Sequence, residues 1–150
     1  MRNAFAFMLI VSAAFSVSAS ESQLESFFKR YLDERFAMHP MEATQLGDHR
    51  FDDKLDDLSP AALERSLQHL KSTRANLRKE IDHSKLSRDA QVDFEIFDHE
   101  LEASIWLREN TKPHAENPRL YNEYISDSVF LLLTQSRLPK ETNIVNAIAR

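Results

Sequence analysis

The chain contains a single glycine, Gly47, in 150 residues, and this constrains the fold more than any other feature of the sequence. Tight β-hairpins depend on Asn-Gly, Asp-Gly or Gly-Gly turns, and none of these dipeptides occurs here. Apolar residues instead recur every three or four positions along almost the whole chain, as they do on one face of an α-helix. The sequence therefore predicts an all-α fold.

Capping residues and apolar spacing divide the chain after residue 19 into about four or five helices that pack antiparallel. Ser22 and Glu25 form the pattern of a capping box at the start of the first helix, which ends before Pro40. Ser59 and Pro60 fit the N-cap and first position of the second helix. The remaining helices are expected over residues 87–110, over 118–134 and from 139 onward.

The last two predicted helices carry more apolar surface than the earlier helices can cover. The helix over 87–110 is apolar on several sides, which is typical of a central helix with neighbours all round. The helix over 118–134 ends in nearly uniform hydrocarbon, and the last apolar pattern runs to Arg150 without a capping signal. We therefore expect residues 20–150 to be the N-terminal helical part of a larger protein truncated at 150, packing against the rest of its own chain beyond Arg150.

The N-terminus has the pattern of an export signal. Arg2 precedes an apolar run over residues 4–17, and Val17-Ser18-Ala19 fits a signal-peptidase site. The run is shorter than the roughly 20 residues that a membrane-spanning helix needs. We predict a signal peptide over residues 1–19, with an uncleaved membrane anchor as the alternative.

Composition narrows the location and the partners of the exported chain. Cysteine is absent, which excludes disulfides, a cysteine nucleophile and a lipid attachment site. The net charge is −5, and basic residues alternate with acidic ones rather than forming a patch. We expect a periplasmic or extracellular protein that is not a lipoprotein, with no nucleic-acid partner and no membrane contact after signal cleavage.

The turn at the only glycine presents the best candidate for substrate binding. Asp48, His49 and Arg50 follow Gly47 directly. An arginine fork can bind a substrate carboxylate through two parallel hydrogen bonds, with the acid and the imidazole beside it to orient the ligand. In the alternative interpretation Asp48 caps the turn and Arg50 pairs with a neighbouring aspartate. Both interpretations are compatible with the sequence.

Two acidic patterns resemble metal sites but lack essential ligands. A zinc-peptidase helix needs His-Glu-x-x-His, and Ala103 stands where the second histidine should follow His99 and Glu100. Glu95, His99 and Glu102 still share a helix face that could hold a divalent cation, although a solvated polar face is the simpler interpretation. The acidic loop lacks the glycine and glutamate of an EF-hand and is expected to be solvated: Asp52, Asp53, Asp56 and Asp57. No catalytic or metal-binding residue is predicted in this chain.

The chain resembles the N-terminal region of the bacterial family called domain of unknown function 885. The resemblance starts in one dense segment and continues through shorter matches downstream: Pro40-x-x-Ala43-Thr44-x-x-Gly47-Asp48-His49-Arg50-x-Asp52, Leu86-Ser87, Trp106 and Asn117-Pro118-x-x-Tyr121. It covers most of the chain after the signal peptide, and the order and spacing of the matches make it specific.

This resemblance implies an enzymatic activity whose catalytic motif does not occur in residues 1–150. Members of the family are larger, helical, often exported, and similar to zinc-dependent peptidases, because a His-Glu-x-x-Pro-Gly-His segment occurs far downstream of the matched region. The resemblance therefore implies that the full-length protein binds zinc and a peptide substrate. It also implies that this chain is the non-catalytic N-terminal part of that protein. The alternative is a self-contained periplasmic helical bundle that binds a protein or a small ligand without catalysis.

Overall fold

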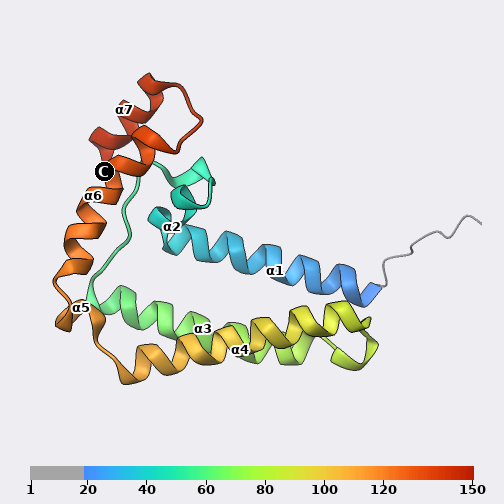
Figure 1. Ribbon diagram of the computed structural model, residues 1–150. Coiled ribbons are helices and arrows are strands. Elements are labelled where there is room, and N and C mark those ends of the chain that lie inside the picture. Colours follow the sequence, from blue (N-terminus) through green and yellow to red (C-terminus); the bar gives the residue numbers. More distant parts are fainter. Residues whose placement is uncertain (1–18) are drawn as a thin grey trace, which may run out of the picture.

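The computed structural model describes residues 19–150, which are built from helices without a β-strand (Figure 1). This confirms the predicted all-α class. The predicted signal peptide lies outside the described residues, apart from Ala19. The elements in chain order are α1 (Ala19–Met38), α2 (Pro40–Gln45), the 3-10 helix η1 (His49–Phe51), α3 (Pro60–Glu80), the 3-10 helix η2 (His83–Lys85), α4 (Arg88–Asn110), α5 (Pro113–Glu116), α6 (Arg119–Thr134) and α7 (Lys140–Ala149).

Local capping sets most of these boundaries. The Ser59 hydroxyl accepts a hydrogen bond from the backbone N–H of Ala62, so the predicted N-cap of α3 is confirmed. Gly47 follows α2 with φ of +87°, the left-handed conformation that glycine adopts without a steric penalty. The predicted capping box at Ser22 is wrong, because Ser22 lies inside α1 and its carbonyl accepts a bond from the Ser26 hydroxyl.

The core lies where α1 crosses the antiparallel pair of α3 and α4 (Figure 1). Burying each large apolar side chain there stabilises the fold by about 1.5–3 kcal/mol. The Phe97 ring of α4 meets the Tyr31 ring of α1 edge to face at 4.9 Å between centroids, which fixes how α1 crosses the pair. The buried members of this core are Leu24, Phe27, Tyr31, Leu70, Leu77, Ile81, Leu86 and Leu101.

Ion pairs hold α3 and α4 together beside the core. Arg78 Nη2 lies 2.6 Å from Asp98 Oδ2, and Arg74 Nε lies 3.2 Å from Asp98 Oδ1. Arg74 also reaches Glu102 Oε1 at 2.9 Å. On the predicted polar face of α4, Glu102 pairs with Arg74, and Glu95 lies 3.2 Å from His83 Nε2, while both carboxylates remain half or more exposed. This face is therefore solvated and carries ion pairs to neighbouring elements.

The helices α6 and α7 form a second pair, which contacts α2 and extends away from the core (Figure 1). Leu131 and Leu132 are buried, whereas Phe130 is 56 % exposed and Ile148 is 80 % exposed. We call the exposed apolar residues of this pair the α6–α7 apolar set: Ile125, Val129, Phe130, Leu133, Ile144, Val145 and Ile148.

The expectation that the helix over 87–110 has neighbours on all sides is wrong for the described residues. Ile96, Trp106 and Leu107 of α4 are exposed, because α1 and α3 both pack on the same side of this helix. No helix within residues 19–150 combines the length and the apolar character that a membrane span requires.

Candidate functional site

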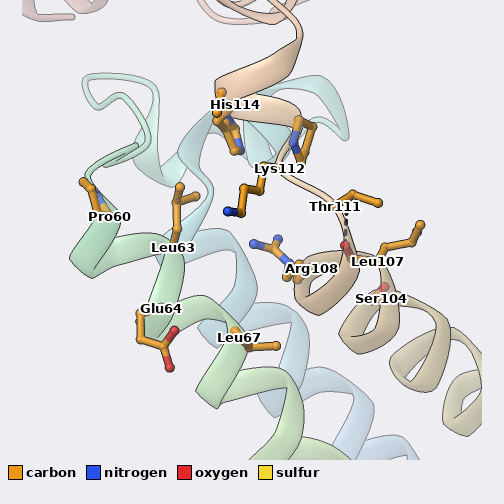
Figure 2. Close-up of a pocket in the computed structure, with 12 residues that line it drawn as sticks. Pro60, Leu63, Glu64, Leu67, Ser104, Leu107, Arg108, Thr111, Lys112 and His114 are labelled. Carbon is orange, nitrogen blue, oxygen red and sulfur yellow. Dashed lines mark hydrogen bonds between the residues drawn. The ribbon is translucent and has the colours of Figure 1, made fainter.

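A pocket of about 650 Å³ lies between the start of α3, the end of α4 and α5 (Figure 2). Leu63 and Leu67 of α3 form one wall, and Leu107 of α4 contributes to the other. A second cavity of about 380 Å³ shares Leu63, Arg108 and His114 with the first and extends towards the loop between η1 and α3. The two cavities therefore share part of their lining, and we refer to them together as the hollow.

The end of α4 positions the polar side of this pocket. Pro113 disfavours helical conformation in the residue before it, and Lys112 is accordingly non-helical with φ of −127° and ψ of 60°. The backbone N–H and the hydroxyl of Thr111 both donate to the Leu107 carbonyl, at 2.9 Å and 2.7 Å, which closes the last turn of α4. The chain then folds back, so that Arg108, Lys112 and His114 face the same hollow (Figure 2).

The cations of the pocket have no carboxylate partner within residues 19–150. Neither Arg108 nor Lys112 makes a side-chain hydrogen bond or an ion pair with a described residue, and the buried Nδ1 of His114 makes no hydrogen bond with one. Desolvation by the surrounding helices, and then the positive charge of Arg35, lower the pKa of Arg108. Tyr31 and Glu42 act in the opposite direction on this pKa, and the Arg108 side chain itself is exposed and accessible to an anion.

One carboxylate lines the pocket, and it is engaged along its own helix. Glu64 Oε1 accepts a hydrogen bond of 2.8 Å from Gln68 Nε2. Figure 2 shows its carboxylate pointing away from Arg108 and Lys112. The pocket therefore combines apolar walls with an excess of positive charge, an arrangement suited to an organic anion.

The predicted substrate-binding turn is held by partners from the chain itself. The Asp48 carboxylate caps η1 by accepting from the backbone N–H of Arg50, and its other oxygen lies 2.6 Å from Arg50 Nη2. The same Nη2 lies 2.7 Å from Asp33 Oδ1. His49 Nδ1 lies 2.9 Å from Asp52 Oδ2. The three residues lie in one turn, but each is already engaged, and none of them lines the pocket. Their part in substrate binding stays a prediction.

The acidic loop after this turn is only partly solvated, contrary to expectation. Asp52 is 1 % exposed and accepts a hydrogen bond of 2.7 Å from the Thr44 hydroxyl. Asp56 Oδ1 accepts from the backbone N–H of Met41 at 2.9 Å, and the backbone N–H of Asp56 donates to the Tyr124 hydroxyl. These bonds compensate for lost hydration and attach the loop to α2 and α6. The sequence does not reveal them, because their partners lie up to 68 residues away.

A protein-family model matches residues 40–150 and is described as a bacterial protein of unknown function (DUF885). The chain belongs to this family. The match confirms the resemblance found in the sequence, starts at the first residue of α2 and includes the whole pocket. A search of curated proteins and a search of solved structures find no match. Within residues 19–150 of this DUF885 chain, no group of three or more histidine, aspartate or glutamate side chains is arranged to hold a metal ion.

Proposed function

We propose that this DUF885 chain is the non-catalytic, N-terminal helical part of an exported zinc-dependent peptidase and that its pocket holds part of the peptide substrate. The observation that carries the proposal is the pocket between α3, α4 and α5, which has recognition groups without a nucleophile–base pair. Apolar walls and unpaired cations bind and orient a ligand but do not break a bond. The reacting groups and the zinc would belong to another part of the protein.

The exposed surface of α6 and α7 supports the same proposal. Seven large apolar residues of this pair are more than two-fifths exposed. Monomeric proteins rarely leave so much neighbouring apolar surface in water. A catalytic part that packs on the α6–α7 apolar set would cover it.

The test starts from the gene. The reading frame is followed past codon 150, the complete protein is expressed with its native leader, and the periplasmic fraction is assayed for zinc content and for cleavage of a fluorogenic peptide library. We expect about one bound zinc for each chain and cleavage that a chelator abolishes. A variant in which the glutamate of a downstream His-Glu motif becomes glutamine should keep zinc and lose cleavage.

The second candidate is a self-contained periplasmic helical protein that binds a small ligand in the same pocket. It is favoured by the lining of the pocket, which already combines apolar walls with the two cations that a small organic anion needs. A reading frame that ends at codon 151, or a complete protein without zinc and without peptide cleavage, would overturn the peptidase proposal and leave this one.

A further inference from the structure

We propose that the pocket between α3, α4 and α5 recognises the free C-terminal carboxylate of a peptide whose last side chain is apolar. Taking a peptide as the ligand rests on the proposed function, whereas the preference for a carboxylate and an apolar side chain rests on the pocket itself. The groups that would bind the carboxylate are the Arg108 guanidinium and the Lys112 ammonium (Figure 2).

The first step concerns Arg108, which differs from the other arginines near the core. Arg35 donates from Nε to both oxygens of Glu42 at 2.9 Å, and Arg74 and Arg78 share Asp98. Arg108 has no such partner within residues 19–150, although it lies near enough to Arg35 to be repelled by it. The Arg108 side chain is exposed and makes no hydrogen bond with a described residue, so its guanidinium is free to bind a carboxylate through two parallel hydrogen bonds.

The second step concerns Lys112, which supplies the other charge. Its side chain points into the hollow from the link between α4 and α5, and both Lys112 and Arg108 line the first cavity (Figure 2). An ammonium group carries three donors that adapt to the ligand, while the fork of Arg108 fixes the orientation of the carboxylate plane. His114 also lines the hollow, although its Nδ1 is buried and makes no hydrogen bond with a described residue.

The third step concerns the chemical class of the anion. Leu63, Leu67 and Leu107 line the hollow beside the cations, so a bare inorganic anion would leave these apolar walls in water. Glu64 also contributes negative charge to the lining, which penalises a phosphate dianion more than a single carboxylate. A peptide end satisfies both conditions, because its carboxylate lies one carbon atom away from an apolar side chain.

The fourth step concerns the rest of the peptide. The second cavity shares Leu63, Arg108 and His114 with the first and continues past His39 towards Asp56. It provides space for the residues that precede the bound end, and Asp56 is already engaged by Met41 and Tyr124. Because Arg108 lines both cavities, a carboxylate that binds to it would leave the second cavity to the preceding residues of the peptide.

The test compares two ligands that differ only in the terminal group. Isothermal titration calorimetry of the intact protein with acetyl-Ala-Leu and with acetyl-Ala-Leu-amide should give at least tenfold tighter binding of the acid. Arg108→Gln and Lys112→Gln should each weaken binding of the acid at least tenfold and leave the amide unchanged. The matched control is Arg88→Gln, because Arg88 lies in the first turn of the same helix, about 30 Å from Arg108 at 1.5 Å rise per residue. It should bind the acid as the wild type does.

Thermal unfolding of each variant checks that a loss of binding does not come from a loss of folding. Equal affinity for acid and amide, or competition by inorganic phosphate as strong as that by acetyl-Ala-Leu, would overturn the inference. Acetyl-Ala-Asp that binds as tightly as acetyl-Ala-Leu would overturn the apolar part of it. Peptide cleavage without a preference for the free acid would refute this inference and keep the proposed function. Tight binding of the acid by a complete protein that cleaves no peptide would refute the proposed function and keep this inference.

Discussion

Removing the Asp98 carboxylate should cost measurable stability without touching the apolar core. It is half-buried between α3 and α4, where Arg78 and Arg74 hold it. The hydrogen bond from Arg78 is the main cause that lowers the pKa of Asp98 from 3.8 to about 2. At about 1.4 kcal/mol for each pKa unit, this corresponds to about 2 kcal/mol of folding stability. Because the Arg78 side chain is 55 % exposed, solvent screening reduces our expectation for Asp98→Asn to about 1–2 kcal/mol.

The pH dependence distinguishes this ion pairing from a packing effect. A carboxyl group whose pKa is lower in the folded state stabilises the protein above its unfolded pKa, and the contribution is lost as pH falls from about 4 towards 2. Urea unfolding at pH 7 should therefore separate Asp98→Asn from the wild type by about 1–2 kcal/mol, and the difference should largely vanish at pH 2. Glu100→Gln, an exposed change two residues along α4, is the control and should stay within about 0.5 kcal/mol. Equal stabilities at pH 7, or an undiminished difference at pH 2, would refute the reasoning.

Three further perturbations test other parts of the fold. Leu77→Ala removes a fully buried side chain between α1, α3 and α4 and should cost about 2–5 kcal/mol in urea unfolding; a cost below 1 kcal/mol would contradict the core assignment. Gly47→Ala should cost about 1 kcal/mol in the same assay from backbone strain alone, because an added Cβ meets no atom within 4 Å. Burial raises the pKa of Tyr124 to about 12, so the wild type should lose stability between pH 10 and 12 more steeply than Tyr124→Phe; identical pH profiles would exclude a buried phenol there.

Features governed by neighbouring residues could be predicted from the sequence. The Ser59 cap, the proline at the start of α3 and the left-handed Gly47 each depend on backbone groups within a few positions. The same reasoning failed at Ser22, because a capping-box pattern does not stop a helix that is already formed upstream of it. Local patterns thus predict which residues can end a helix, and the surrounding chain decides whether they do.

Features governed by distant contacts could not be predicted. The acidic loop looks solvated in the sequence, yet Asp52 is buried: Thr44 of α2 donates a hydrogen bond to it, and Arg150 Nη2, after the end of α7, lies 3.9 Å from its Oδ1. Arg108 and Lys112 look like ordinary helix-end cations, which are common because they complement the helix dipole. Only the return of the chain at Pro113 towards α3 shows that they face a hollow. The sequence Thr111-Lys112-Pro113 does predict the end of this helix, but it does not indicate which residues lie opposite Arg108 and Lys112.

The apolar stripe of α3 shows how one periodic pattern supports both folding and recognition. Its second half, with Leu70 and Leu77, is buried against α1 and α4, whereas Leu63 and Leu67 in its first half are half-buried and line the pocket. The spacing is the same in both halves, so the division comes from the partner helices. Leu101 and Ile105 of α4 complete the core, and one turn later the helix presents Arg108 instead of a further apolar residue. The hollow therefore lies where the α3–α4 pair stops burying apolar side chains, which makes the recognition surface an extension of the core rather than a separate structure.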